Sequence, residues 1–397
     1  MLEKLKICFI SDFAKTGGAA IAADRIAKSL NNADVNVCRI SSDGCKDSLF
    51  EEKVLQDSRK MQFLQLFSTG SAMSYMLSTI RNHDLCRQLQ KNLSFLDPDF
   101  IYLNNLHSAG WPLTFAEISF KIAPTSWILH DCSSFLGSYY PSQCPIPSVK
   151  KMEELQRFWK RISKSNSNGK FSSIAPSNWM QKEAKSSYWK KFASEVIHYP
   201  IFSVYHSKPN RFACKKALDL DENKTTILAV AGNLDEERKG GHLLKDIIHS
   251  HEFSDSQFIL LGNSNKLKPL PPNVFDLGFV HDETFKCIVY NSADLTLHCA
   301  PVDNLPNTAI ESIACGTPVL AFDTGGLQDI VVPEKTGWLV ETENPFSLKN
   351  YLQEIIKYRK YKSAFFTFQE HLDKSFEPIK IANEYLEFSE FILSENK

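Results

Sequence analysis

Short apolar runs alternate with longer amphipathic segments along the first half of the chain. Between the first two runs, Ala19–Leu30 places its apolar residues three and four positions apart, as one face of a helix requires. A strand, a helix and a second strand in this order form a unit whose strands are parallel. The strands expected in this half are Lys6–Ile10, Val35–Ile40, Phe100–Leu103, Ser126–His130, Ser172–Ala175 and Glu195–Tyr199.

A second alternating series follows a segment of different character. Residues Tyr199–Leu220 contain two prolines, many polar residues and little periodicity, as an interdomain connection does. After about Pro345 we expect helix to the end of the chain. The later strands are expected at Thr225–Ala231, Gln257–Leu261, Val274–Leu277, Ala293–Leu297, Pro318–Ala321 and Trp338–Val340, and the helices between them at Gly241–Ser250, Asp282–Asn291 and Pro306–Cys315.

The order of elements predicts two doubly wound α/β domains, each built on a parallel sheet. We place them at residues 1–200 and 201–375, with a C-terminal helix at 376–397 that packs back toward the first domain. Ligands of such sheets lie outside the carboxyl ends of the strands. The expected functional site is therefore a cleft between two facing domains.

Composition narrows the classes of function. The length of 397 residues suits two or three domains, and a formal net charge of −1 provides no global field for holding nucleic acid. The 10 cysteines include no Cys-x-x-Cys pair and no zinc-like spacing. No apolar run has the length of a signal-peptide core or the roughly 18 residues of a membrane span. We therefore expect a cytoplasmic protein with reduced thiols.

Two acids with seven residues between them flank the start of an expected short helix. Asp303 precedes this helix, and Glu311 lies about one and a half turns inside it. Asn304 is the expected cap, Pro306 suits the first turn, and Gly316 suits the position after the last. Taken alone, Asp303 is explained as a partner of the helix dipole and Glu311 as a solvated helix residue. Together they can meet one ligand near amides that attract phosphate, one acid holding a sugar and the other a ribose.

A second segment joins an expected strand to an expected helix and carries two adjacent cations, Arg238 and Lys239, followed by Gly240 and Gly241. Arg forms planar multidentate hydrogen bonds and Lys provides a compact charge, so the pair suits a pyrophosphate. By themselves, the two residues are more simply explained as an exposed charge pair.

These two segments, with Gly325-Gly326 shortly after them, resemble the nucleotide-sugar site of the retaining glycosyltransferases of family 4, which have the GT-B fold. In that family two Glu residues with seven between them mark the donor site. Asp303 stands where the first Glu usually lies, and Glu311 stands at the second. The Arg-Lys-Gly sequence of the family is the diphosphate clamp, which implies that role for Arg238 and Lys239.

The resemblance also implies how the donor lies. Asp303 and the amides of Asn304 and Leu305 face the donor sugar, while Glu311 bonds the ribose hydroxyls. The set of donor-binding residues that follows from it is Gly17, Gly18, Asn304, Leu305, Asn307, Thr308 and Glu311.

Two features of the first domain agree with this reading. Gly17-Gly18 lies between the first strand and its helix, where small residues let a ligand approach the backbone, although a plain tight turn needs glycine too. His130 and Asp131 follow an apolar strand. His130 can be a strand-end histidine bonded to backbone, and Asp131 can orient it or cap the loop. The resemblance implies that the glycine loop lies near the acceptor and the donor phosphates and that His130 contacts the donor sugar.

The reaction implied is a retaining transfer of a hexose from a UDP- or GDP-linked donor to an acceptor hydroxyl, without metal ion or other cofactor. With no evident protein nucleophile, the resemblance suggests front-face displacement, with His130, Arg238, Lys239 and Asp303 as the catalytic set. The acceptor is expected to be a glycan or a lipid-linked precursor in polysaccharide, lipopolysaccharide or glycolipid biosynthesis. The alternatives are a catalytically silent nucleotide-sugar-binding subunit and a sugar-nucleotide epimerase of the same fold.

One stretch raises the question of membrane contact. Residues 150–191 carry eleven Lys and Arg side chains with aromatic residues among them. Such a composition suits a peripheral contact with the inner surface of a membrane. Solvated helix faces explain it as well.

Overall fold

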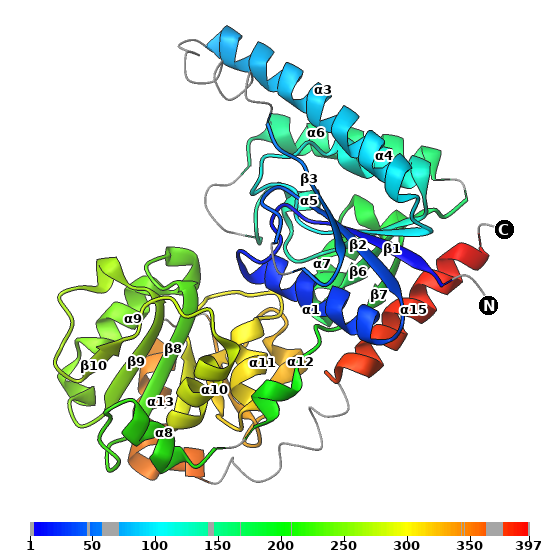
Figure 1. Cartoon of the computed structure of the whole chain (residues 1–397). Coiled ribbons are helices and arrows are strands. Elements are labelled where there is room, and N and C mark those ends of the chain that lie inside the picture. Colours follow the sequence, from blue (N-terminus) through cyan, green and yellow to red (C-terminus); the bar gives the residue numbers. More distant parts are fainter. Residues whose placement is uncertain are drawn as a thin grey trace. The chain divides into compact units, whose positions relative to one another are not determined.

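The computed structural model describes residues 4–45, 48–57, 71–141, 147–166, 168–207, 209–342, 344, 346–362 and 376–395. The chain divides into two compact units, each an α/β unit with its own sheet (Figure 1). Unit 1 comprises Met1–Pro176, Met180–Ile197 and Ile379–Lys397, and unit 2 comprises Ser177–Trp179 and His198–Pro378.

Unit 1 is built on a seven-stranded sheet in which all strand pairs are parallel. The order β3-β2-β1-β4-β5-β6-β7 reverses direction between β1 and β4. The strands are β1 (Lys6–Ile10), β2 (Asn36–Ser41), β3 (Glu51–Val54), β4 (Phe100–Leu103), β5 (Thr125–Ile128), β6 (Phe171–Ala175) and β7 (Ala193–Val196), and the principal helices are α1 (Gly18–Asn32), α3 (Ser71–Leu96), α4 (Thr114–Ile122), α5 (Ser133–Leu136), α6 (Val149–Ser165) and α7 (Asn178–Ser186).

The C-terminal helix α15 (Pro378–Ser394) packs on this sheet, and Figure 1 draws it in red beside the blue first strand. The hydroxyl of Tyr102, on β4, donates to the carbonyl of Tyr385 on α15 at 2.8 Å, and both side chains are fully buried. The last helix of the chain is therefore part of the core of unit 1.

Unit 2 is built on a six-stranded parallel sheet in the order β10-β9-β8-β11-β12-β13, which reverses between β8 and β11. A buried apolar cluster packs beneath its helices. The strands are β8 (Thr226–Asn233), β9 (Gln257–Asn263), β10 (Val274–Asp276), β11 (Leu295–His298), β12 (Val319–Phe322) and β13 (Gly337–Val340), and the principal helices are α8 (Arg211–Ala217), α9 (Gly241–Ile248), α10 (Glu283–Ser292), α11 (Asn307–Ala314), α12 (Leu327–Ile330) and α13 (Phe346–Tyr358).

The two doubly wound parallel sheets confirm the predicted fold class, and each expected strand is present within a few residues. The sequence Glu51–Val54 was not expected to be a strand because three of its four residues are charged; it forms the edge of the sheet, where charged side chains reach solvent. The expected helical end of the chain contains α13 and α15, and residues 363–375 lie outside the described residues. Across the part of the chain that is described, no helix combines the length and the apolar character needed to cross a bilayer.

Candidate functional site

Three loops of unit 2 meet at the carboxyl edge of its sheet, beside the point where the strand order reverses. They follow β8, β11 and β12, and β8 and β11 are neighbours in the sheet. In doubly wound sheets this is where ligands bind. The two cations lie on the first loop, Asp303 on the second and the glycine pair on the third.

Asp303 is the centre of this site, and it is 5% exposed. Its Oδ2 accepts a hydrogen bond from Lys239 Nζ at 2.5 Å and lies 3.7 Å from His298 Nε2. Burial raises the pKa of Asp303, but the charge of Lys239, that of His298 in its protonated form at low pH, and that of Arg238 outweigh it and bring the pKa to about 2. Asp303 is therefore an ionised, buried carboxylate held by a cation.

The backbone around Asp303 is packed so closely that glycine is required at two contacts. A Cβ atom on Gly325 would lie 1.8 Å from the carbonyl oxygen of Asp303, and one on Gly240 would lie 2.0 Å from that of Cys299. Both glycines have positive φ, 60° and 75°. These contacts fix the loop that carries Asp303 against the loops that precede and follow it.

The residues that follow Asp303 correct one expectation. Asn304 does not cap helix α11: its Oδ1 accepts a hydrogen bond from Ser177 Oγ at 2.7 Å, within unit 2. The N-cap position is taken by Pro306, which has no capping side chain, and the helix begins at Asn307. The helix therefore begins one residue later than predicted. Leu305 is buried, and Asn307 and Thr308 are partly exposed at the first turn.

Glu311 lies inside the same helix and is 4% exposed, so it is not a solvated helix residue. Its Oε2 accepts a hydrogen bond from the hydroxyl of Tyr290 at 2.8 Å. Burial and the neighbouring Glu311 charge raise the pKa of Tyr290, which keeps its proton on the donor side of this bond. Tyr290, on α10, was not among the predicted residues because only the tertiary fold brings it to Glu311.

Arg238 lies beside Lys239 on a short helical turn, Glu237–Lys239, and forms an ion pair with Glu236 at 2.7 Å. The side chains of Arg238 and Lys239 are 30% and 21% exposed. They are thus neither fully solvated nor buried. The pair of Arg238 with Glu236 is partly exposed on both sides and therefore weak, so Arg238 can exchange this partner for an anionic ligand, whereas Lys239 is paired with the buried Asp303.

The predicted residues of unit 1 lie at the carboxyl edge of its own sheet. Gly17, at φ 92°, precedes α1, and Gly18 is the first residue of that helix. His130 lies two residues beyond β5 and is 6% exposed; its Nε2 is 2.8 Å from Asn104 Oδ1. Burial, and then the charge of His107, lower the pKa of His130 to about 3, so its ring is neutral at pH 7.

Asp131 caps the loop rather than orienting His130. Its Oδ1 accepts from the backbone amide of Ser133 at 2.8 Å, and its Oδ2 accepts from Asn105 Nδ2 at 2.9 Å. His107 Nε2 lies 3.7 Å from the same Oδ2, and His107 Nδ1 lies 3.0 Å from the hydroxyl of Ser133. Asp131 therefore organises the loops that follow β4 and β5.

A cavity of about 350 Å³ opens among these loops of unit 1. Its walls are mostly apolar, with Trp111 and Trp127 among them, and its polar groups include His107, Ser133 and Lys151. Sequence reasoning missed this cavity because its lining comes from two loops and from α6, and no local motif marks it.

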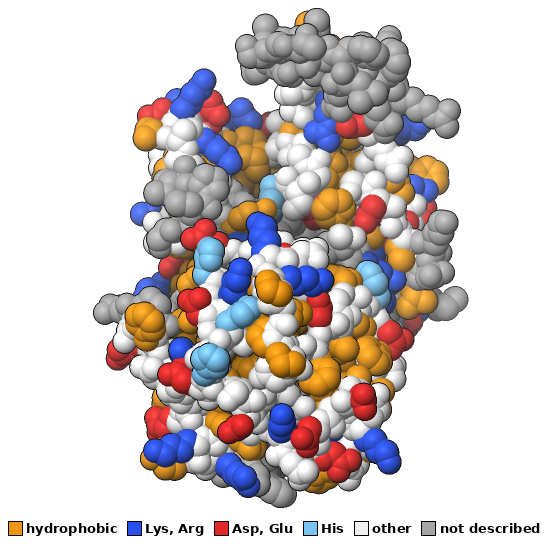
Figure 2. Space-filling view, turned by 90° about the vertical axis from the view of Figure 1, so that its left-hand side faces the viewer, with side chains coloured by type: hydrophobic (Ala, Val, Ile, Leu, Met, Phe, Trp, Pro, Cys, Tyr) orange, Lys and Arg blue, Asp and Glu red, His pale blue; other side chains and the backbone are white. Residues whose placement is uncertain are grey.

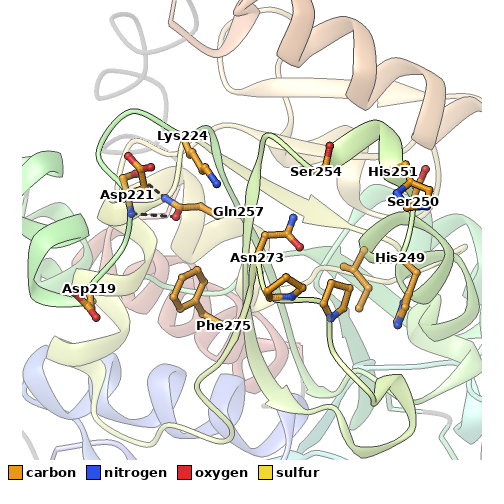
Figure 3. A pocket seen from close by; sticks show the side chains of 13 residues that line it. Asp219, Asp221, Lys224, His249, Ser250, His251, Ser254, Gln257, Asn273 and Phe275 are labelled. Atoms are coloured by element: carbon orange, nitrogen blue, oxygen red, sulfur yellow. Dashed lines mark hydrogen bonds between the residues drawn. The ribbon is translucent and has the colours of Figure 1, made fainter.

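A cavity of about 630 Å³ in unit 2 lies away from the predicted residues (Figure 3). Gln257, the first residue of β9, and Asn273, just before β10, line it, so it lies at the amino edge of the sheet, opposite Asp303. Asp221 and Gln257 bond one another there through two hydrogen bonds, of 3.1 and 2.8 Å. His249, at the other end of the cavity, has each ring nitrogen 2.9 Å from a backbone carbonyl oxygen. The polar side chains of Gln257 and His249 are thus already bonded to neighbouring groups of the protein.

Charge on the visible surface agrees with the balanced composition. Figure 2 shows basic and acidic side chains interspersed, with no continuous basic face in that view. Within the described ranges, no group of three or more His, Cys, Asp or Glu residues is arranged to hold a metal ion.

The part of the chain that holds Asp303, Lys239 and Glu311 is similar to known proteins. Residues 211–366 match the family Glycosyl transferases group 1. The uncharacterized glycosyltransferase MJ1607 of Methanocaldococcus jannaschii is 25% identical over 156 residues, which are 37% of this chain and 40% of that protein. Glycogen synthase 1 of Synechococcus sp. (strain JA-3-3Ab) is 27% identical over 148 residues, 34% of this chain and 30% of the synthase. The chain thus spans two fifths or less of the length of these curated relatives.

Solved structures resemble the whole chain. Sucrose-phosphate synthase from Thermosynechococcus elongatus superposes with a TM-score of 0.76 at 16% identity, over 98% of this chain and 100% of the synthase. Anabaena Alr3699/HepE, solved in complex with UDP and glucose, gives 0.70 at 19% identity, over 97% and 99% of the two chains. At such identities the likeness shows the fold, which is GT-B. The residues that match glycosyl transferases group 1 all lie within unit 2 of this chain.

Proposed function

We propose that the protein is a glycosyltransferase that moves a sugar from a nucleoside diphosphate to an acceptor hydroxyl. The observation that carries the proposal is the buried carboxylate of Asp303, held ionised by Lys239 beside Arg238, in the unit that matches the glycosyl transferases group 1 family. A departing diphosphate needs positive charge, and a sugar that develops oxocarbenium character is stabilised by a carboxylate beside it. The site offers both at the position where doubly wound sheets bind ligands.

The donor would lie across the three loops of unit 2. Arg238 and Lys239 take the diphosphate, Asp303 and the amides of Asn304 and Leu305 face the sugar, and Glu311 bonds the ribose. Glu311 suits this role because a carboxylate held in place by Tyr290 can accept hydrogen bonds from ribose hydroxyls. The base is uracil or guanine; HepE, of the same fold, was solved with UDP-glucose, which favours UDP.

We infer retention of configuration by front-face displacement. The acceptor hydroxyl attacks the anomeric carbon on the side from which the diphosphate leaves, and its proton passes to the departing phosphate oxygen. In this proposal His130, neutral at pH 7, contacts the donor sugar and takes no proton. The mechanism assigns neutralisation of the diphosphate to Arg238 and Lys239 and to no metal ion.

The acceptor would enter through the cavity of unit 1. Apolar and aromatic walls with a few hydroxyl and cationic groups suit a glycan or a lipid-linked precursor. Helix α6 supplies Lys151 to this cavity and also carries the exposed apolar side chains of Val149 and Met152 beside its Lys and Arg residues. This arrangement supports, as part of the proposal, a cytoplasmic enzyme that rests on the inner surface of a membrane.

Thermal stabilisation by a panel of UDP- and GDP-sugars tests the proposal first. One donor is expected to raise the melting temperature of the wild type, and Arg238→Ala and Glu311→Ala are expected to abolish the rise. Lys216→Ala, an exposed cation of the same unit, is the matched control and keeps it. Folded wild-type protein that no donor stabilises would contradict the proposal.

Turnover then separates an enzyme from a silent binding subunit. With the stabilising donor, release of nucleoside diphosphate in the presence of glycan or lipid-linked acceptors is expected for the wild type and not for Asp303→Ala. Binding without any turnover would favour the silent subunit. Interconversion of the donor into an epimer without an acceptor would favour an epimerase.

A further inference from the structure

His298 presents a buried polar atom that the proposed chemistry has not yet used. It is the last residue of β11, five positions before Asp303, and is 7% exposed. Its Nε2 has no hydrogen-bond partner among the residues that the structure describes. Buried polar side-chain atoms are nearly always bonded, so this nitrogen requires an explanation.

The neighbour that can supply a partner is Asp303. Its Oδ2 lies 3.7 Å from His298 Nε2, which is too long for a hydrogen bond. The same oxygen accepts the bond from Lys239. One carboxylate oxygen is thus approached by two donors and is bonded to only one of them.

The state of the ring fits this role. Burial lowers the pKa of His298 to about 4, with Asp303 opposing and Lys239 adding to the effect, so the ring is neutral at pH 7. A neutral imidazole carries one N–H, and the tautomer with the proton on Nε2 directs it toward the carboxylate. A small shift of the Asp303 carboxylate then closes the gap.

We propose that His298 is a positioning residue of the donor site: its Nε2–H becomes the partner of Asp303 when a donor diphosphate draws Lys239 away. This inference rests on the proposed function, in which Lys239 serves the diphosphate. The departure of Lys239 removes the cation that balances the buried carboxylate, and the His298 N–H replaces part of that support when the sugar needs Asp303 in place. His298 holds Asp303 toward the sugar and does not itself touch the substrate.

The test compares the binding of a nucleoside diphosphate with that of the intact donor. Calorimetry would use UDP and UDP-glucose, or GDP and GDP-mannose if the guanine pair binds. For His298→Leu, the Kd for the diphosphate alone worsens by only a few fold, because this ligand also draws Lys239 away, while that for the nucleotide sugar and kcat both worsen by about tenfold or more, as loss of a bond to a charged group implies. His298→Gln, which keeps an N–H donor, is expected to recover most of the loss.

Two controls separate positioning from a structural role. His206, in the same unit, also has a buried Nε2 without a hydrogen-bond partner in the described part of the chain, so His206→Leu is a matched change that should alter neither Kd. In an Asp303→Asn background, His298→Leu should add little further loss, because it acts through that carboxylate.

The outcomes distinguish this inference from the function on which it rests. If the wild type binds neither nucleotide nor nucleotide sugar, both are overturned. If the wild type binds and turns over the donor but His298→Leu and His298→Gln match it, only the role of His298 is overturned. Equal weakening of diphosphate and donor, with no recovery by Gln, also overturns it and indicates a packing role. If His298→Leu does not fold, His298→Ala, which also lacks the N–H donor, takes its place beside His298→Gln in the same comparison of the two Kd values.

Discussion

Replacement of Lys239 by Met should change how the stability of the protein depends on pH. In the wild type the pKa of Asp303 lies at about 2 instead of the ordinary 3.8. At 1.36 kcal/mol per pH unit, ionised Asp303 therefore stabilises the folded state by about 2 kcal/mol. Because this pKa is depressed, the contribution is complete above pH 4 and is lost only as the pH falls from about 4 to about 2.

Without Lys239 the balance at Asp303 reverses. Burial is the largest influence on its pKa and acts upward, so removing the nearest cation lets burial prevail and the pKa rises above 3.8. An ionised Asp303 then destabilises the folded state near neutral pH. We expect Lys239→Met to cost at least about 2 kcal/mol at pH 7, and less at pH 4.5, where the variant protonates Asp303 and removes part of the penalty.

Urea denaturation at both pH values, followed by circular dichroism, measures the difference between the wild type and Lys239→Met. The control is the double variant Lys239→Met with Asp303→Asn, whose side chain cannot titrate and whose cost relative to the wild type should not fall between pH 7 and pH 4.5. If the cost of Lys239→Met is the same at the two pH values, burial does not govern Asp303 and the reasoning fails.

Three further outcomes follow from single contacts. Tyr290→Phe removes one hydrogen bond to the Glu311 carboxylate and should lower the free energy of unfolding by about 1.5–3 kcal/mol and weaken UDP or GDP binding; unchanged nucleotide affinity in calorimetry would separate Glu311 from the nucleoside. Gly240→Ala should abolish donor binding in the thermal-shift assay because its Cβ meets the Cys299 carbonyl, while Gly278→Ala, also at positive φ but with open space around it, should retain binding. The ring resonances of His130 should not titrate by NMR between pH 8 and pH 5, and a midpoint inside that range would contradict its burial.

The strands could be predicted because parallel strands buried on both faces read as continuous apolar runs. Phe100–Leu103 and Val319–Phe322 are buried at every position, and each is close to its expected range. Glu51–Val54 could not be predicted, since an edge strand of charged residues carries no such run. Periodicity thus reveals the centre of a sheet and says little about its border.

The candidate site could be predicted only in part. Asp303, Lys239 and Glu311 lie in local motifs, and the fold brings the loops that carry them to one sheet edge. Tyr290 and His298 lie in no motif, because what sets them apart is a tertiary contact with an acid and not a spacing along the chain. The charge state of Asp303 was equally hidden, since it depends on burial and on a cation 64 residues away.

The sequence predicts that Lys239 is a phosphate ligand, but in the structure Lys239 is paired with Asp303. It keeps Asp303 ionised in a buried position where desolvation favours the neutral acid. One ammonium group cannot remain on the carboxylate and also follow the diphosphate as it leaves. Binding of the donor would therefore transfer positive charge from the acid to the phosphate and leave Asp303 negative beside the anomeric carbon, where developing positive charge is stabilised. In the proposed mechanism, the ion pair seen in the structure is the resting form of the site, and its charges become available for catalysis only when the donor separates them.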